Sequence, residues 1–246
     1  MSLTRQFPWR LQIHEVLPST SDLCRSVAAA GEPEGLAVLA HRQTQGRGSR
    51  GRAWGSPAGN LFLSVLLRPQ ERARDAAQWS LLAGVALGEA LAGYLPDASA
   101  LRLKWPNDVL LHGKKLAGIL VDSSADADGK VEWLVIGIGA NLAVAPEVPG
   151  RAVACLADLA APPPPEHVAE TLLARLGHWR QVREGAGFAP VRAAWLARAP
   201  APDSAVTLRL GEHHLSGGFA GLGEDGSLLL ASEGRVRAFT TGEVLL

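Results

Sequence analysis

The sequence predicts an α/β (α+β) protein in which a mixed sheet and its helices are followed by a small C-terminal β-barrel. Strand-like segments follow one another closely between residues 101 and 138, which favours an antiparallel or mixed sheet over a parallel sheet with helical crossovers. Long stretches at 76–95 and 166–183 have the apolar spacing of helices. About five short β-like segments, separated by glycine-rich turns, crowd into roughly the last 45 residues.

Local patterns place each element. The stretch 9–17 alternates apolar and polar residues as a strand does, Pro18 ends it, and the side chains of 19–22 can cap a helix. Because Pro200 and Pro202 interrupt the pattern, we expect a main domain over 1–199 and a second domain over 200–246. Strands are predicted at 9–17, 36–41, 60–67, 101–105, 109–111, 116–122, 133–138, 205–210, 215–222, 227–231, 235–240 and 243–246. Helices are predicted at 23–30, 76–95, 155–160, 166–183 and 190–198.

Composition excludes several classes of protein. The 246 residues are 47% apolar and 20% charged, which is typical of a chain that folds around a core. The 24 basic and 24 acidic residues cancel, so neither a nucleic acid nor a membrane surface is expected as a partner. The two cysteines, Cys24 and Cys155, lack metal or disulfide spacing, and no apolar run reaches the ~20 residues of a membrane helix. We therefore expect a cytoplasmic location.

The first candidate site is the glycine- and arginine-rich stretch Gln43–Trp54. Three glycines allow the backbone to approach a ligand closely, and three arginines carry planar guanidinium groups that match phosphate or carboxylate oxygens. A tryptophan supplies a flat apolar wall. We interpret the stretch as a loop that grips a phosphate-bearing small molecule; the alternative, an RNA-binding surface loop, is disfavoured by the balanced charge. These residues are Gly46, Gly48, Gly51, Arg47, Arg50, Arg52 and Trp54.

A turn that contains a proline, between two short predicted strands, carries the second group of candidates. Lys104 and Lys115 would place positive charge beside a polyphosphate. Asn107 or Asp108 could hold Mg²⁺ or orient a polar group, and either side chain could also bond merely to the backbone of its own turn. Two weaker features are Asn141, which follows a predicted strand, and the triplet 19–21, for which a helix cap is the favoured interpretation.

The motifs GRGSRGRAW, KWPNDV…GKKLAGIL and GIGANL, in this order and spacing, resemble the signature of biotin protein ligases, from about Leu11 to the C-terminus. The resemblance implies a class II aminoacyl-tRNA-synthetase-like catalytic domain with a central mixed sheet, and a small SH3-like C-terminal β-barrel. It implies that biotin and ATP, with Mg²⁺, give biotinyl-5′-AMP and pyrophosphate. A lysine of the biotin carboxyl carrier protein of acetyl-CoA carboxylase would then take the biotin. Larger members carry an N-terminal DNA-binding module, and this sequence resembles the form without it.

The resemblance also implies roles for single residues. Arg47 and Lys115 are the expected catalytic groups, because a reaction between two anions needs them to be positioned and neutralised. The sequence assigns no metal ligand. Biotin is expected at Ser19, Thr20, Ser21, Gln43, Gly46, Arg47, Gly48, Ser49, Lys115 and Gly118. ATP is expected at Arg50, Arg52, Trp54, Lys104, Asn107, Asp108 and Asn141, with Trp54 as a stacking partner.

Two positions depart from the family pattern. Ser21 stands where asparagine is common, and Ser49 replaces the second arginine of the usual GRGR. Because that loop retains the reactive adenylate in the family, Ser49 would loosen retention unless Arg50 compensates, and the sequence leaves both outcomes open. A lipoate or octanoate ligase of the same fold is the nearest alternative, which the paired motifs disfavour. A homodimer is also left open, with 60–67 or the neighbouring sheet as the surface that could support it.

Overall fold

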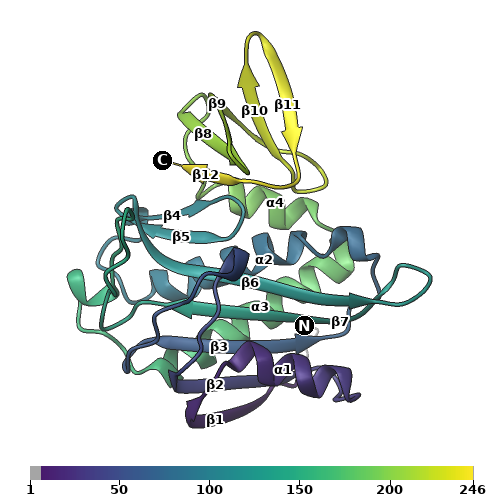
Figure 1. Ribbon diagram of the computed structural model, residues 1–246, viewed down its shortest axis with the longest axis vertical. Coiled ribbons are helices and arrows are strands. Elements are labelled where there is room, and N and C mark those ends of the chain that lie inside the picture. The colour runs from purple at the N-terminus through teal and green to yellow at the C-terminus, as the bar shows by residue number, and fades with distance from the viewer. Residues whose placement is uncertain (1–6, 246) are drawn as a thin grey trace, which may run out of the picture.

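The computed structural model describes residues 7–245, which form two sheets and four α-helices (Figure 1). Residues 1–6, at the start of the predicted main domain, and Leu246, at the end of the last predicted strand, lie outside the described residues. The large sheet contains β1 (Arg10–Leu17), β2 (Leu36–Gln43), β3 (Leu61–Leu67), β4 (Leu101–Lys104), β5 (Asp108–Leu111), β6 (Lys114–Ala125) and β7 (Val131–Ala140). The small sheet contains β8 (Ala205–Leu210), β9 (His213–Leu222), β10 (Leu228–Ser232), β11 (Arg235–Phe239) and β12 (Glu243–Leu245).

The helices are α1 (Thr20–Ala29), α2 (Gln78–Ala92), α3 (Pro165–Ala186) and α4 (Ala189–Leu196). Short 3₁₀ turns occur at η1 (Ser49–Gly51), η2 (Ala73–Asp75), η3 (Ala98–Ala100) and η4 (Leu156–Asp158). The short helical piece predicted at 155–160 forms as the single 3₁₀ turn η4. The Asp158 carboxylate accepts the Cys155 N–H at 3.0 Å and caps that turn.

The large sheet is mixed, as predicted. Its strand order is β1-β2-β3-β7-β6-β5-β4, with β1 parallel to β2 and every other pair antiparallel. The small sheet is antiparallel in the order β11-β10-β9-β8-β12, which confirms a small C-terminal β domain. Strand β3 lies inside the large sheet and is buried along its length, so the segment 60–67 offers no free edge for a dimer.

Helices cover the two faces of the large sheet unequally. Figure 1 shows α2 and α3 behind the sheet and α1 in front of it. The buried side chains behind the sheet include Leu63 and Ile138, which point toward the two long helices. In front, Cys24 of α1 packs on Leu66 and Val135, and burial raises the pKa of the Cys24 thiol to about 12. Because α1 covers only part of the front face, the remainder is open for a site.

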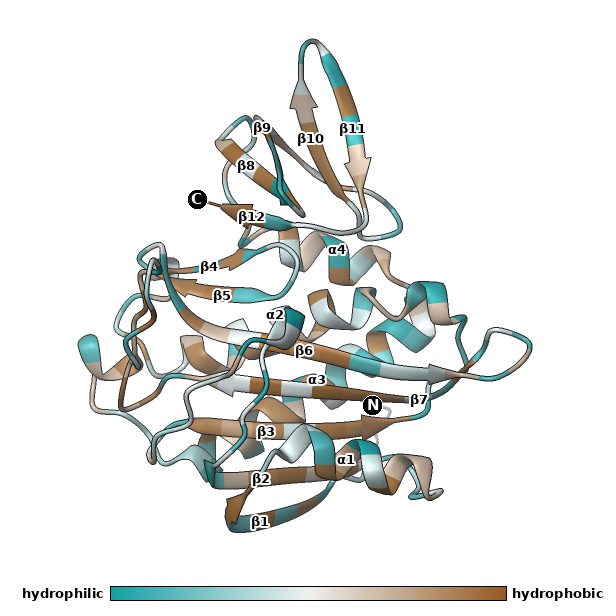
Figure 2. Ribbon diagram, in the orientation of Figure 1, coloured by the Kyte–Doolittle hydropathy of each residue, from teal (hydrophilic) through white to brown (hydrophobic). Residues whose placement is uncertain are grey.

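The C-terminal sheet is fixed to the main domain beside β4 and β5 (Figure 1). The indole N–H of Trp105 donates to the Gly226 carbonyl at 3.1 Å, and the Arg192 guanidinium Nε donates to the Leu222 carbonyl at 2.8 Å. In Figure 2 the hydrophobic colour follows the strands of the large sheet. Within residues 7–245, none of the helices is both long and apolar enough to cross a membrane.

Candidate active site

The floor of the candidate site is the front face of β6, β7 and β3. In the sheet register, Gly118 lies opposite Gly139, and Leu120 lies opposite Gly137, which in turn lies opposite Ser64. Because side chains alternate between the two faces of a strand, all five residues share the front face. Three glycines therefore leave a shallow floor, on which other side chains or a ligand can approach the backbone.

A β-bulge directs Lys115 toward this floor. Val109 pairs with Ala117 but Leu110 pairs with Lys115, so Leu116 is an extra residue on β6. The bulge reverses the alternation and places Lys115 on the same face as Gly118. The Asp108 carboxylate meets it there.

Asp108 holds two lysines beside the floor. Its Oδ1 lies 2.5 Å from the Lys115 ammonium and its Oδ2 lies 2.9 Å from the Lys104 ammonium. Burial lowers the pKa of Lys115, while the Asp108 charge acts in the opposite direction. Asn107 donates its side-chain N–H to the Ile119 carbonyl of β6 at 2.7 Å. The alternative in which both side chains bond only to their own turn is therefore wrong.

The glycine- and arginine-rich stretch forms a lid, defined as residues 44–56, that crosses the floor. Its two arms are joined by backbone hydrogen bonds, from Gly48 N to Arg52 O at 2.8 Å and from Trp54 N to Gly46 O at 2.9 Å. The tip turns through positive φ angles of 59° at Arg50 and 72° at Gly51. Such angles are rare for residues with a side chain, and they make the tip compact.

The Trp54 ring lies on the glycine floor. A Cβ atom at Gly139 would lie 2.6 Å from the ring, and one at Gly118 would lie 3.0 Å from it. The Lys115 ammonium lies 5.4 Å from the ring centroid, which is a cation–π distance. Only residues without a side chain could stand beneath the ring. The ring divides the site into two pockets.

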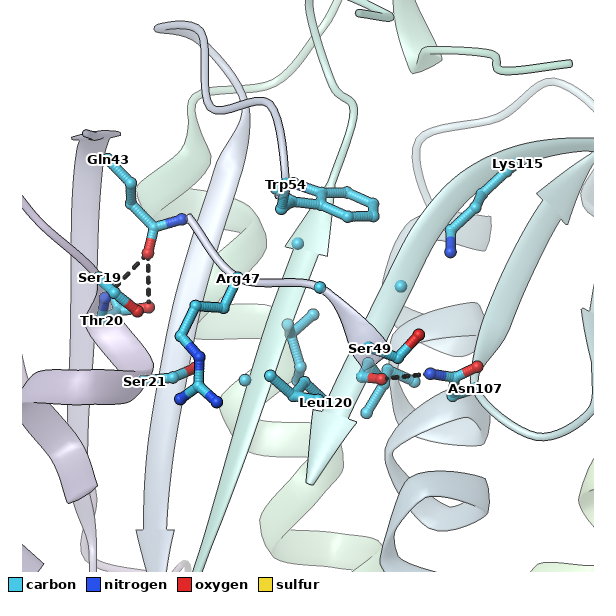
Figure 3. A pocket seen from close by; sticks show the side chains of 16 residues that line it. Ser19, Thr20, Ser21, Gln43, Arg47, Ser49, Trp54, Asn107, Lys115 and Leu120 are labelled. Carbon is cyan, nitrogen blue, oxygen red and sulfur yellow. Dashed lines mark hydrogen bonds between the residues drawn. The ribbon is translucent and has the colours of Figure 1, made fainter. Parts of the chain in front are cut away.

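One pocket lies between α1 and Lys115 (Figure 3). At its polar end the side-chain Oε1 of Gln43 accepts the Thr20 backbone N–H at 2.8 Å, and the Thr20 and Ser64 hydroxyls lie 2.8 Å apart. Ser19 is the N-cap of α1, as predicted, and it also lines the pocket. Its lining is Ser19, Thr20, Ser21, Gln43, Arg47, Gly48, Ser49, Trp54, Asn107, Lys115, Gly118, Ile119, Leu120, Gly137, Ile138 and Gly139.

A second pocket lies on the far side of Trp54, with Pro146, Val148 and Val153 as apolar walls. Asn141 stands at its base and is 1% exposed. The Asn141 side-chain N–H donates to the Ala154 carbonyl at 3.0 Å, whereas its buried Oδ1 has no partner among the residues that the structure describes. A buried acceptor of this kind is costly unless a ligand donates to it.

A third, more basic pocket lies at the tip of the lid. It is lined by Ser49, Arg50, Arg52, Lys104, Trp105, Pro106, Asn107, Asp108, Gly242 and Glu243. Glu243 of β12 pairs with Arg50 at 2.9 Å and Arg52 at 3.4 Å, and also with Arg151 and Arg209. Burial alone would raise the pKa of Glu243, but the Arg209 hydrogen bond and the neighbouring arginine charges lower it to about 2.

The structure brings the predicted residues into three adjoining pockets. Those expected at biotin line the first pocket, except Gly46, which packs against Ser56 and the Trp54 carbonyl. Those expected at ATP line the second and third. Among the lining residues absent from the sequence candidates, five lie along the floor and two are charged. Alternating glycines in IGIGA, residues 136–140, were an available signal for the floor, whereas nothing local pointed to the charged pair. These residues are Ile119, Leu120, Gly137, Ile138, Gly139, Arg151 and Glu243.

A pocket lined by hydroxyl groups adjoins a basic pocket and an apolar pocket, and Lys104 and Lys115 lie where they meet. These features define an enzyme that acts on a small molecule and uses a nucleotide. The sequence profile described as "Biotin/lipoate A/B protein ligase family" matches residues 13–141. The biotin–[acetyl-CoA-carboxylase] ligase of Paracoccus denitrificans is 40% identical over 213 residues, which are 84% of this chain and 88% of that protein. The same-named ligase of Mycobacterium tuberculosis is 32% identical over 92% of this chain and 85% of that protein.

The fold agrees with a solved structure. The biotin protein ligase from Aquifex aeolicus in complex with biotin and ATP superposes with a TM-score of 0.80 at 28% identity, over 96% of this chain and 97% of that one. The chain belongs to the biotin/lipoate A/B protein ligase family.

Proposed function

We propose that this chain is a biotin–protein ligase that activates biotin with ATP as biotinyl-5′-AMP and transfers the biotin to a lysine of a biotin carboxyl carrier protein. The observation that carries the proposal is the order of groups along the site. Neutral hydroxyl and amide groups lie at one end of the first pocket, and Lys115 lies at the other. A ureido ring with a carboxylate tail has the same order of polarity. The relatives named as biotin–[acetyl-CoA-carboxylase] ligases support the same substrates.

The biotin ring is assigned to the end of the pocket formed by Ser19, Thr20 and Gln43. These side chains offer both donors and acceptors, which a ureido group needs. The tail would run along the floor beside the Trp54 ring, which covers Gly118 and Gly139, and bring its carboxylate to Lys115. Ser21 stands where asparagine is common in the family. Its hydroxyl is hydrogen-bonded to the Ser64 hydroxyl at 3.0 Å, so its contribution to binding the biotin ring would be indirect.

ATP is assigned to the other two pockets. The phosphates would lie among Arg50, Arg52 and Lys104, where the positive charge gathers. The adenine base would enter the second pocket, where the unpaired Oδ1 of Asn141 can accept a hydrogen bond from the exocyclic amino group of the base. Trp54 would then stand as the wall between base and biotin tail.

The donor set of the described residues does not form a metal site of its own. No group of three His, Cys, Asp or Glu side chains gathers within residues 7–245, and the Asp108 carboxylate is engaged by two lysines. Mg²⁺ readily binds through substrate phosphates and water, with few protein ligands. We therefore treat Mg²⁺ as part of the MgATP substrate.

The proposed chemistry needs no nucleophile from the enzyme. A biotin carboxylate oxygen forms a bond to the α-phosphorus, and the bond to the bridging oxygen of pyrophosphate breaks. The amine of the carrier lysine then attacks the acyl carbon, loses a proton, and AMP leaves. Arg47 and Lys115 would serve by holding two anions together and stabilising charge on phosphorus.

The remaining assignments belong to the same proposal. We assign 1–199 to catalysis and 200–246 to a C-terminal domain, since β8 opens the second sheet after α4 ends. An acetyl-CoA carboxylase carrier is the proposed partner in a cytoplasmic setting, without nucleic acid. The homodimer stays a hypothesis.

Biotin-dependent exchange of labelled pyrophosphate into ATP tests the proposed function. Exchange with biotin and none with lipoate is expected, followed by transfer of labelled biotin to a carrier domain. Lys115→Ala should lower exchange by about 100-fold or more, because it removes charge beside the α-phosphate. Lys114→Ala, which removes an exposed neighbouring ammonium, is the matched control. Exchange with lipoate alone, or near wild-type exchange by Lys115→Ala, would contradict the assignment.

A further inference from the structure

Two carboxylates that the proposed reaction does not use meet Arg47 at the rim of the first pocket. Arg47 Nη1 lies 2.8 Å from Asp22 Oδ1 of α1 and 3.4 Å from Asp122 Oδ2 of β6. Arg25 of α1 lies 3.3 Å from the same Asp22 oxygen and 3.9 Å from the same Asp122 oxygen. The four side chains therefore form a ring of alternating charge that joins the lid to a helix and a strand.

Helix capping does not account for Asp22. It stands three residues after the N-cap Ser19, where an acidic side chain commonly stabilises a helix N-terminus. Its backbone N–H does donate to the Ser19 hydroxyl, but its carboxylate is directed to Arg25 and Arg47. A helix cap at Asp22 would need no contact with the lid, so capping does not explain the ion pair between Asp22 and Arg47.

Asp122 is placed by the strand alternation that builds the floor. It follows Gly118 and Leu120 at steps of two along β6, and it lies opposite Val135 in the register. It therefore points from the front face, as they do. Its side chain is 24% exposed, which is low for a carboxylate on an open face, because Arg47 and Arg25 cover it.

Arg47 links this ring to the pocket. It lines the pocket, and Figure 3 shows its side chain descending from the lid between Ser21 and Leu120. We propose that Asp22 and Asp122 are positioning residues that clasp the lid over the first pocket through Arg47, and so retain biotinyl-AMP between the two half-reactions. The proposal rests on the proposed function, which supplies the intermediate to be retained.

The clasp is weak enough to open. The Asp22 side chain is 47% exposed and that of Arg47 is 35% exposed, so solvent screens the pairs. Exposed pairs of this kind shift an equilibrium by about twofold to fivefold each. A lid that admits a carrier lysine must open in every cycle, and pairs of this strength permit that. Residue 49 is serine where arginine is common in the family. The lid of this chain therefore depends more on this ring of ion pairs to stay closed.

The release rate of the intermediate tests the clasp. The protein is loaded with biotin and ATP labelled at the α-phosphate, in the presence of pyrophosphatase, and then chased with unlabelled biotin and ATP. Label retained on the protein is followed on filters. We expect Asp22→Asn/Asp122→Asn to release biotinyl-AMP about fivefold to tenfold faster than wild type, and Asp22→Asn alone about threefold faster.

Arg25→Gln is the matched control. It removes the link between α1 and Asp122 but leaves both carboxylates to Arg47, so release should stay within about twofold of wild type. Release by the double variant at the wild-type rate overturns the clasp. Equally fast release by Arg25→Gln also overturns it, because the carboxylates would then act by docking α1. If the double variant does not fold, Asp22→Asn alone decides. A wild-type protein that forms no labelled adenylate overturns the proposed function instead, and the clasp with it.

Discussion

Replacing Glu243 with glutamine probes the ion pairs that join the lid and the main domain to the C-terminal sheet. The carboxylate is 10% exposed and is shared by four arginines, of which Arg50 and Arg52 come from the lid. Its pKa falls from the ordinary 4.5 to about 2. That change corresponds to about 3 kcal/mol of folding stability at neutral pH. Because Arg50 and Arg52 are 44% and 39% exposed, we reduce the expected value to about 2 kcal/mol.

The sign of the pH dependence follows from the lowered pKa. A carboxylate whose pKa is depressed by folding stabilises the folded state above its unfolded pKa of 4.5, and this stability is lost as the pH falls toward 2. By about pH 3.5, about 1.4 kcal/mol of the Glu243 contribution should be gone. In Glu243→Gln no proton is exchanged at this position, so the difference between the two proteins should shrink by that amount.

Urea unfolding of wild type and Glu243→Gln between pH 7 and about pH 3.5 measures this difference. Glu212→Gln, an exposed change in the turn between β8 and β9, is the control that should leave the free energy of unfolding unchanged. A difference below about 0.5 kcal/mol at pH 7 would refute the magnitude. A difference that stays constant as the pH falls would refute the assignment of the lowered pKa to Glu243.

Two further predictions concern the lid and the floor beneath it. Ser49→Arg should slow the release of biotinyl-AMP about fivefold to tenfold, since a guanidinium at the junction of the three pockets can bond the phosphate; equal labelling of bystander proteins by Ser49→Arg and wild type would contradict it. Gly139→Ala should raise the KM for biotin about tenfold, because its Cβ would lie 2.6 Å from the Trp54 ring. Gly185→Ala, with no atom near its Cβ, is the control, and an unchanged KM would show that the ring does not wall the biotin site.

Local sequence patterns predicted most elements of the fold but not their order in the sheet. Period-two alternation identified β1, and the long apolar period identified α2 and α3, within a few residues at each end. The parallel pairing of β1 with β2, and the insertion of β7 between β3 and β6, depend on contacts between distant segments. A pattern within one stretch of the sequence cannot predict those contacts, because they join segments that lie far apart in the chain.

The site shows the same division between local and distant information. Lys104, Asp108 and Lys115 were found because one short stretch holds all three. The bulge that turns Lys115 toward the floor is visible only in the pairing of β5 with β6. Glu243 was missed because it meets Arg52 of the lid from 191 residues away in the chain, and no pattern around it predicts its burial.

The two ends of the lid differ in charge balance, and the difference bears on how the site would work. At the rim, Arg47 and Arg25 meet two carboxylates, so the ring is neutral and can hold the lid without a further anion. At the tip, four arginines share the single charge of Glu243, which leaves a net charge of +3 among these five side chains. A polyphosphate can therefore join the tip without displacing Glu243. The rim would govern when the lid opens, and the tip would govern how strongly a nucleotide is held.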